Sequence, residues 1–494
     1  MRGNNFRKSV RPDKLSFLWL LLAAVLMVFS NGRWIIPLAA WLAPVFMIRF
    51  LRTSKAATGL VCGALVSVAA GMISFYAMIP VPGMVYYPVA GSIALLFFVP
   101  FVVDRLLANK VGGFLSTLVF PLAFTSLEYA NSLVSPYSTW GALAYTQYGN
   151  LPLMQITAVT GIWGTTFLIT WFAALVNQAW QEGFDWGKIK KGVLGYVTVG
   201  LLLALIGGAR LALFTPQRET VRVASITVST PNLSRTSIAT QTEEETLRRQ
   251  TLQIQKDLLA LSQQAATGEA RIVFWQETAA PVFEEDYTEF LNQATETTRK
   301  QNIYLLIAVS VRPRDYPGQP LENKTVLIDP SGEVKWSFLK ARPAPREGVV
   351  RGDGVISFSD TPFGRIASVI CFDMDFPRLI RQAGAARVDL MLVPSRDWKA
   401  ISPYHTHMAV FRAIENGFSM VRSAGSGLSA AVDYQGRVLN SKNFLTSNQK
   451  IMYADVPTKG VATIYAKIGD VFAWLCIGGF ISILIYIGGK KRGK

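Results

Sequence analysis

Long apolar stretches constrain the fold of this chain more than any other feature. Seven precede residue 215 and an eighth lies near the C-terminal end; they cover about 15–30, 34–51, 57–79, 87–103, 111–129, 156–178, 192–214 and 469–489. Most can cross roughly 30 Å of hydrocarbon as α-helices, and the first two are near the lower limit. The formal net charge is +17, yet 51% of the residues are hydrophobic. This combination predicts a membrane protein rather than a nucleic-acid-binding one.

The distribution of Lys and Arg predicts the orientation. These residues lie before the first stretch, in alternate loops and after the last stretch: Arg2, Arg7, Lys8, Arg11, Lys14, Arg49, Arg52, Lys55, Arg105, Lys110, Lys188, Lys190, Lys191, Lys490, Lys491, Arg492 and Lys494. The other short loops carry only Arg33, and residues 111–187 contain neither residue type. Because basic loops stay in the cytoplasm, we expect a multi-pass protein of the cytoplasmic (inner) membrane with both termini cytoplasmic. Residues 215–468 are then extracytoplasmic, on the periplasmic side.

The first apolar stretch also has the basic flank of a signal peptide. No small-x-small cleavage site follows it, and another apolar stretch begins at once, so we expect a retained helix. Farther along, polar and aromatic residues gather around Glu128, Tyr145, Gln147 and Gln155. They are either ordinary buried or interfacial residues, which their types favour, or the lining of a lipid or substrate opening.

From residue 220 the pattern changes to strands alternating with helices. We expect strands at 221–228, 271–275, 304–311, 365–370, 389–394, 418–423 and 451–456, helices at 243–266, 283–302, 377–386 and 404–417, and hairpins at 324–339 and around 433–436. Such alternation predicts a layered α/β domain. The chain is therefore divided into a transmembrane domain (1–214), an α/β domain (215–467) and a C-terminal transmembrane helix with a basic tail (468–494).

Cys371 is the only cysteine in the predicted extracytoplasmic domain. The other two, Cys62 and Cys476, lie in predicted membrane helices, so Cys371 has no disulfide partner within its domain. It ends a β-branched run and precedes Pro377, which opens an amphipathic helix. A helix N-terminus beside a thiol favours the thiolate. Cys371 is therefore either a buried core residue or a reactive thiol.

A nucleophilic thiol needs a base and a group that stabilises an oxyanion. The chain has two histidines, His405 and His407, both in the predicted helix 404–417. A Cys–His pair requires that helix to face the thiol. The alternative is a carboxylate base paired with a lysine. Glu277 and Lys340 suit this alternative, because both follow predicted strands. Neither metal-ligand spacings nor a phosphate-binding Gly loop occurs, so we expect no metal and no cofactor.

Several motifs resemble a known family. The segments Trp275–Thr278 and Ile370–Asp373, together with Lys340, are similar to the Glu, Cys and Lys motifs of the nitrilase (carbon–nitrogen hydrolase) superfamily. An eight-helix frame with such a domain between helices seven and eight resembles the apolipoprotein N-acyltransferase family. Residues 143–148, 161–168 and 405–417 resemble this family more narrowly. The resemblance implies about eight membrane helices and an extracytoplasmic αββα sandwich.

It also implies a reaction. Glu277 would be the general base and Cys371 the nucleophile, with Lys340 and the backbone N–H of Phe372 holding the oxyanion. An acyl chain would pass from a membrane phospholipid, through a Cys thioester, to the N-terminal amine of diacylglyceryl-cysteine on an apolipoprotein. The resemblance places an additional active-site acid at Glu347 and an aromatic wall at Trp398. Asp373 stands where the family has Glu, and residues 229–242 contain no counterpart of a mobile-arm Trp.

Two other functions compete with this one. A membrane-anchored nitrilase-type amidase or acyltransferase acting on another lipid or a small amide would use the same three residues. A transporter or non-catalytic scaffold would tolerate alanine at Glu277, Lys340 and Cys371. The paired, Gly- or Pro-broken helices typical of transporters are absent from the sequence pattern.

Overall fold

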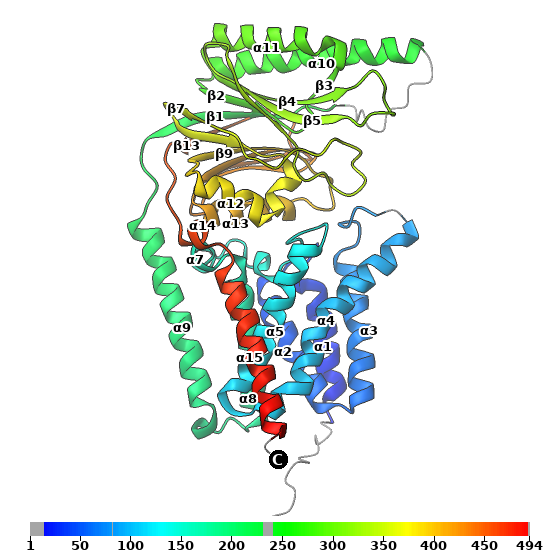
Figure 1. Cartoon of the computed structure of the whole chain (residues 1–494), viewed down its shortest axis with the longest axis vertical. Coiled ribbons are helices and arrows are strands. Elements are labelled where there is room, and N and C mark those ends of the chain that lie inside the picture. Colours follow the sequence, from blue (N-terminus) through cyan, green and yellow to red (C-terminus); the bar gives the residue numbers. More distant parts are fainter. Residues whose placement is uncertain (1–13, 82, 231–240, 493–494) are drawn as a thin grey trace, which may run out of the picture. The chain divides into compact units, whose positions relative to one another are not determined.

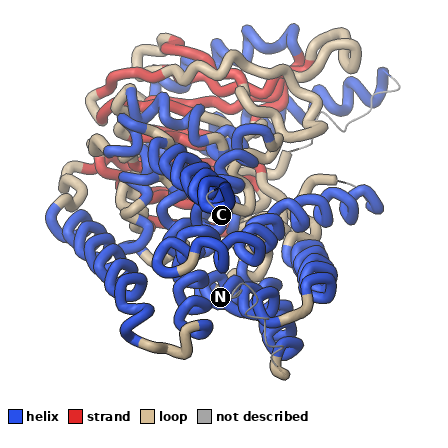
Figure 2. The backbone as a smooth tube through the Cα atoms, turned by 60° about the horizontal axis from the view of Figure 1, so that its bottom comes forward, coloured by secondary structure: helices blue, strands red, loops and turns tan. Residues whose placement is uncertain are grey.

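The computed structural model describes residues 14–81, 83–230 and 241–492. The basic residues Arg2, Arg7, Lys8, Arg11 and Lys494 and most of the segment 229–242 lie outside the described residues. The chain divides into two compact units, Met1–Ala209 with Asp470–Lys494, and Arg210–Gly469. The first is helical, whereas the strands belong to the second (Figure 1, Figure 2).

All eight apolar stretches form helices in the first unit or at its boundary. They are α1 (Ser16–Ser30), α2 (Pro37–Thr53), α3 (Ala56–Ser74), α4 (Tyr86–Val111), α5 (Gly113–Val134), α8 (Ile162–Gln181), α9 (Trp186–Leu213) and α15 (Val471–Arg492). Five of these, α3, α4 with the turn before it, α5, α9 and α15, are long and apolar enough to cross a membrane alone. A sixth span results if α8 is joined to the short helices at Leu151–Thr160, from which it is bent by 118°.

The predicted membrane helices are thus confirmed, and their number as separate spans is approximate. Helices α1 and α2 have 15 and 17 residues, fewer than a straight span needs. Their apolar side chains pack with those of α4, α5 and α8 in one cluster that includes Phe50, Phe101 and Phe120. The unit is that of a multi-pass membrane protein.

The polar group around Glu128 is buried and internally bonded. Glu128 on α5 accepts hydrogen bonds from the backbone N–H of Leu143 (2.8 Å) and from the hydroxyl of Thr166 (2.6 Å). Gln147 accepts one from the indole N–H of Trp41 (3.0 Å). These bonds fix the short 3₁₀-helix η2 (Leu143–Gln147) against its neighbours. They give these residues a structural role.

The second unit is a sandwich of two sheets. The first sheet has the order β13-β1-β2-β4-β5-β6, with β3 paired to β4, and the second has the order β12-β11-β10-β9-β8-β7. The strands are β1 (Thr220–Ile226), β2 (Ile272–Trp275), β3 (Ala280–Phe283), β4 (Tyr304–Arg312), β5 (Glu322–Ile328), β6 (Val334–Leu339), β7 (Phe358–Thr361), β8 (Gly364–Ser368), β9 (Leu390–Arg396), β10 (Ser419–Gly425), β11 (Leu428–Val432), β12 (Val438–Asn443) and β13 (Ile451–Pro457).

Helices cover both outer faces of the sandwich. The first sheet is covered by α10 (Gln241–Thr267) and α11 (Tyr287–Gln301), and the second by α12 (Pro377–Ala385) and α13 (Tyr404–Asn416) (Figure 1). Between the sheets, Phe274 and Leu306 share a buried cluster with Leu392 and Val421. The αββα sandwich implied by the family resemblance is confirmed.

Three elements of this unit differ from the sequence prediction. The predicted helix 283–302 begins only at Tyr287, because Ala280–Phe283 forms β3 beside β4. Strand β7 and the short helix α14 (Ile464–Ile468) were not predicted. All three are four or five residues long. Segments of that length give only a weak periodicity signal, so some of them are missed.

The C-terminal end of α9 is hydrogen-bonded to the turn between β11 and β12. The side-chain amide of Gln435 donates to the carbonyls of Arg210 and Phe214 (both 2.7 Å), and Arg437 donates to that of Leu211 (2.8 Å). The last carbonyls of a helix have no partner within it. The turn supplies these partners, which explains why the second unit begins at Arg210.

Candidate active site

Cys371 lies at a sharp backbone turn between the second sheet and α12. Strand β8 ends at Ser368, and Cys371 begins the 3₁₀-helix η5 (Cys371–Asp375), which leads into α12 at Pro377. Its φ of 51° is in the left-handed region that residues other than glycine rarely adopt. The thiol-bearing residue is 6% exposed. Such a conformation persists only where the surroundings fix it, and it is typical of functional sites.

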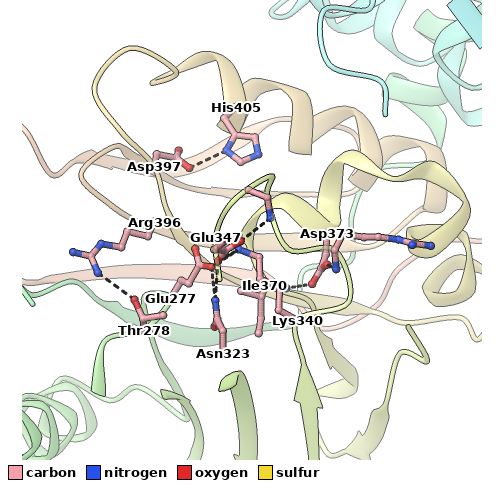
Figure 3. Close-up of polar contacts among 12 residues, drawn as sticks. Glu277, Thr278, Asn323, Lys340, Glu347, Ile370, Asp373, Arg396, Asp397 and His405 are labelled. Carbon is pink, nitrogen blue, oxygen red and sulfur yellow. Dashed lines mark hydrogen bonds and ion pairs between the residues drawn. The ribbon is translucent and has the colours of Figure 1, made fainter. Parts of the chain in front are cut away.

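Glu277 and Lys340 form a buried ion pair next to this turn. The Lys340 Nζ lies 2.7 Å from Glu277 Oε1 and 2.6 Å from Glu347 Oε1. The side-chain amide of Asn323 donates to the same two oxygens, at 2.8 and 3.3 Å. Figure 3 shows the four side chains converging. One lysine and one amide therefore hold two carboxylates in a fixed arrangement.

The sheet explains why these residues meet. Lys340 directly follows β6, and its backbone N–H donates to the carbonyl of Asn323 (2.9 Å), which extends the β5–β6 ladder by one pair. Glu277 follows β2, and the side chain of the preceding Gln276 bonds both backbone groups of Val228. Glu347 is held by the N–H of Ala344 (2.7 Å). Each functional side chain is thus anchored through backbone bonds of its own segment.

Burial and neighbouring charges determine the protonation states of Glu277, Lys340 and Cys371. Burial raises the pKa of Glu277, but the ammonium of Lys340 and hydrogen bonds from Lys340, Asn323 and the Cys371 thiol bring it below its usual value. Burial lowers the pKa of Lys340, yet Glu277 and Glu347 raise it well above its usual value. Burial and the charge of Glu277 raise the pKa of Cys371 well above its usual value. The resting site therefore contains a thiol, a carboxylate and an ammonium.

This proton distribution corrects one expectation. A helix N-terminus beside Cys371 was expected to favour the thiolate. The residue instead begins η5, and burial together with Glu277 outweighs the dipole of any neighbouring helix. A thiol in this protonation state would act as a nucleophile only if an adjacent base removed its proton.

Asp373 connects the Cys371 turn to the segment after Lys340. Its carboxylate accepts the backbone N–H of Arg342 (2.7 Å) and that of Ile370 (3.0 Å). Asp373 is fully buried, and burial raises its pKa to about 7. The shorter side chain, which stands where the family has Glu, thus holds two segments of the site together (Figure 3).

A second charged cluster flanks Cys371. His405 on α13 places Nδ1 2.8 Å from Asp397 Oδ1 and Nε2 3.2 Å from Asp375 Oδ2. Arg422 on β10 places Nη2 3.0 Å from Asp397 Oδ1. All four side chains are buried. The helix 404–417 therefore does bring one histidine to the thiol, and His407 is not part of this cluster.

Sequence reasoning missed Asn323, Asp375, Asp397 and Arg422. Two of them carried a signal: Asn323 is opposite Lys340 across the predicted hairpin, and Arg422 is a charge inside an otherwise apolar strand. Asp375 and Asp397 are ordinary acids at the ends of buried elements. Nothing in their spacing distinguishes them from solvated surface charges.

The donors of Cys371, Asp397 and His405 lie within 4.8 Å of one another. Zinc uses such donors. The guanidinium of Arg422, however, lies 2.9 Å from His405 Nδ1 and 3.0 Å from Asp397 Oδ1. A positive charge already balances the carboxylate there, so we assign no metal to these residues.

The two aromatic residues named from the sequence differ in their surroundings. Phe372 is buried and packs edge-on against Phe376, with ring centroids 5.2 Å apart. Trp398 follows Asp397 and is 38% exposed. Its role as an aromatic wall stays a prediction.

Comparisons with known proteins cover both units. Residues 23–175 match the family model of the apolipoprotein N-acyltransferase N-terminal domain, and residues 241–465 match that of carbon-nitrogen hydrolase. An amidase from Nesterenkonia sp. aligns with 52% of this chain and 96% of its own, at 18% identity and a TM-score of 0.42.

Three relatives extend over most of the chain. The apolipoprotein N-acyltransferase of Geobacter metallireducens is 27% identical over 73% of this chain and 72% of its own. That of Bradyrhizobium diazoefficiens is 27% identical over 75% and 73%. Apolipoprotein N-acyltransferase 1 of Treponema denticola is 22% identical over 96% of both chains. With a helical membrane unit and a Cys-containing αββα sandwich that each match their own model, this chain belongs to the apolipoprotein N-acyltransferase family.

Proposed function

We propose that this protein moves an acyl chain from a membrane phospholipid, through a thioester on Cys371, to the N-terminal amine of a diacylglyceryl-cysteine on an apolipoprotein. One observation carries the proposal. The buried Cys371 thiol lies beside Glu277, whose carboxylate is paired with Lys340 (2.7 Å), in a chain whose helical half matches the N-terminal domain of this family. A lipid-embedded unit and a thiol–carboxylate–lysine site are what acyl transfer between two lipids requires.

The first half of the reaction forms the thioester. Glu277 accepts the thiol proton as the sulfur of Cys371 attacks the sn-1 ester carbonyl of the phospholipid. The tetrahedral oxyanion is stabilised by Lys340 and the backbone N–H of Phe372. When the C–O bond breaks, Glu277 returns the proton to the leaving oxygen. A lysophospholipid leaves, and the acyl chain stays on sulfur.

The second half transfers the chain to nitrogen. The neutral α-amine attacks the thioester carbonyl, and Glu277 accepts a proton from the amine nitrogen. The C–S bond then breaks, and the proton returns to the sulfur of Cys371. Thioesters are more reactive toward amines than oxygen esters are, so passing through sulfur makes amide formation from a lipid ester faster.

The charge arrangement suits these steps. The raised pKa of Lys340 keeps it an ammonium throughout, so it acts as a donor and not as a base. Glu347 gives Lys340 a second carboxylate partner (2.6 Å). When Glu277 becomes protonated, Lys340 therefore retains an anionic partner and stays in position. This is the role we propose for Glu347.

We propose that the enzyme works at the outer face of the inner membrane. The alternation of basic loops supports cytoplasmic termini and a periplasmic catalytic unit. Lipoprotein N-termini anchored by diacylglycerol and phospholipid donors are both available in that leaflet.

A transfer assay tests the proposal. Purified full-length protein is incubated with acyl-labelled phospholipid and a synthetic diacylated lipopeptide, and the triacylated product is quantified by mass spectrometry. We expect product with the wild type and with Cys476→Ala, and none with Cys371→Ala or Glu277→Gln. A wild-type protein that makes no triacylated lipopeptide but releases ammonia from small amides would replace this proposal with the amidase alternative.

A further inference from the structure

The cluster of Asp375, Asp397, His405 and Arg422 lies beside the thiol, yet the proposed steps do not use it. Its groups come from four different parts of the chain: Asp375 from η5, Asp397 from the segment between β9 and α13, His405 from α13, and Arg422 from β10. All four are at most 4% exposed. Burying four ionisable side chains is costly unless they compensate one another. Such a cluster at the nucleophile calls for a function.

Geometry places His405 between two carboxylates. One ring nitrogen faces Asp397 (2.8 Å) and the other faces Asp375 (3.2 Å). Carboxylates on both sides of the ring favour its protonated, cationic form, whereas Arg422, whose Nη2 lies 2.9 Å from Nδ1, opposes it. Cys371 faces the same ring, since its sulfur is within 4.8 Å of the His405 and Asp397 donors. Figure 3 shows the Asp397–His405 pair on one side of the Glu277–Lys340–Glu347 group.

The charge balance around Cys371 makes this cation important. Glu277, Glu347, Asp375 and Asp397 outnumber the permanent cations Lys340 and Arg422. Moving the thiol proton to Glu277 transfers a negative charge from the side of Lys340 to the sulfur. That transfer is favoured by positive charge near the sulfur, and Arg422 and His405 both lie close to it.

We propose that protonated His405 is a positioning residue that, together with Arg422, compensates the negative charge on Cys371 when the thiol gives its proton to Glu277. The charges of Asp397 and Arg422 already act on the thiol in opposite directions, Asp397 raising its pKa and Arg422 lowering it. The inference rests on the proposed function only in taking Cys371 as the nucleophile. It concerns the reactivity of the thiol and not the identity of the acyl donor.

A pH signature follows. Burial lowers the pKa of His405, but Asp375 and Asp397 raise it against the opposing charge of Arg422, to about 8. The groups that face the ring are Asp375 and Cys371 from η5, Asp397 from the segment after β9, and Arg422 from β10. Below pH 8 the cation assists the thiol, and above it the ring is neutral. His405→Gln mimics the neutral ring at every pH.

The experiment measures alkylation of Cys371 by iodoacetamide in the full-length protein between pH 6 and 9.5. Modified Cys371 peptide is quantified by mass spectrometry, so no lipid substrate is needed. A cation within 4–6 Å shifts a thiol pKa by about one unit or more, so wild type should react about tenfold faster than His405→Gln at pH 6.5. Above pH 9 the two rates should converge. A ratio that is independent of pH would overturn the inference and leave His405 a merely structural residue.

The chain supplies a matched control and a measurement that needs no variant. His407 lies on the same helix, and burial lowers its pKa to about 4, so it is neutral throughout; His407→Gln should keep the wild-type profile. With only two histidines in the chain, selective ¹⁵N-histidine NMR of wild type should show one ring titrating near pH 8. A His405 ring that is neutral at pH 6.5 would contradict the proposal even if His405→Gln fails to fold.

The two proposals fail separately. An enzyme that makes no triacylated product but shows the pH-dependent alkylation ratio would refute the proposed function and retain the role of His405. An active acyltransferase with a pH-independent ratio would do the opposite.

Discussion

Replacing Lys340 with methionine removes the positive charge that holds two carboxylates of the site. The Lys340 Nζ is 2.7 Å from Glu277 and 2.6 Å from Glu347, and the side chains of Lys340 and Glu277 are 3% and 4% exposed. The methionine side chain has a similar length and no charge. In the variant, Glu277 remains buried with the Asn323 amide and the Cys371 thiol as its polar neighbours, and no cation lies between Glu277 and Glu347.

The expected cost is that of an uncompensated buried charge. Breaking a buried ion pair by removing one partner typically costs ~3–5 kcal/mol of folding free energy. Glu347 contributes less than Glu277, because its side chain is 23% exposed. For a unit of this size such a loss lowers the melting temperature by roughly 10 °C. Acyl transfer should fall to background in the same variant, because the oxyanion loses a donor and Glu277 becomes protonated.

The stability lost in Lys340→Met should depend on pH. In the wild type Lys340 helps to hold the pKa of Glu277 below its usual value. That pairing therefore stabilises the fold above the unfolded pKa, and its contribution is lost as pH falls through the lower folded pKa. In Lys340→Met, burial without the lysine charge raises the pKa of Glu277. Lowering the pH then protonates the Glu277 carboxylate, which removes the free-energy cost of burying an unpaired charge. The difference in melting temperature should narrow between pH 8 and pH 5.

Tryptophan-fluorescence melting of the purified protein measures these differences. The double variant Lys340→Met/Glu277→Gln is the matched control, since it removes both charges and keeps an oxygen for Asn323. It should recover most of the lost stability while remaining inactive. If Lys340→Met melts at the wild-type temperature, or if the double variant is no more stable than the single one, the reasoning about a compensated buried pair is refuted.

Two further predictions concern the Cys371 turn and the orientation. Asp373→Asn should lower the free energy of unfolding by ~1–3 kcal/mol, because the backbone N–H of either Arg342 or Ile370 then faces an amide NH₂. Thermal melting and the rate of Cys371 alkylation both measure the change. Unchanged values would show that the two segments do not depend on Asp373. A cysteine replacing exposed Glu269 should react with a membrane-impermeant maleimide in intact spheroplasts, whereas one replacing exposed Lys188 should react only after lysis; the reverse pattern would contradict the proposed orientation.

The sequence was sufficient for the elements that have strong periodicity or composition. Every long apolar stretch became a helix, and the alternation after residue 220 became the αββα sandwich. Glu277, Lys340 and Cys371 were proposed as site residues because each follows a predicted strand and resembles a family motif, and the structure brings their side chains together. Elements of four or five residues, such as β3 and β7, were missed because pairing with a neighbouring strand, not local pattern, determines them.

The charged surroundings of the thiol could not be predicted. Asp375, Asp397 and Arg422 act together only because β9, β10, η5 and α13 meet in space. The protonation of Cys371 was also out of reach, since burial and the charge of Glu277 decide it and neither is local in sequence. Similarly, Asp373 looked like a shortened Glu, and its function became clear only from the two backbone groups that it binds.

The most direct test of the account is the mass of the Cys371 peptide after exposure of the enzyme to phospholipid without an acceptor. We expect a peptide heavier by one acyl group, sensitive to neutral hydroxylamine as a thioester is, and returned to the free thiol when a diacylated lipopeptide is added. Cys62 and Cys476 should stay unmodified. An unmodified Cys371 under conditions in which the same preparation forms triacylated lipopeptide would contradict the central claim that the acyl chain travels on this sulfur.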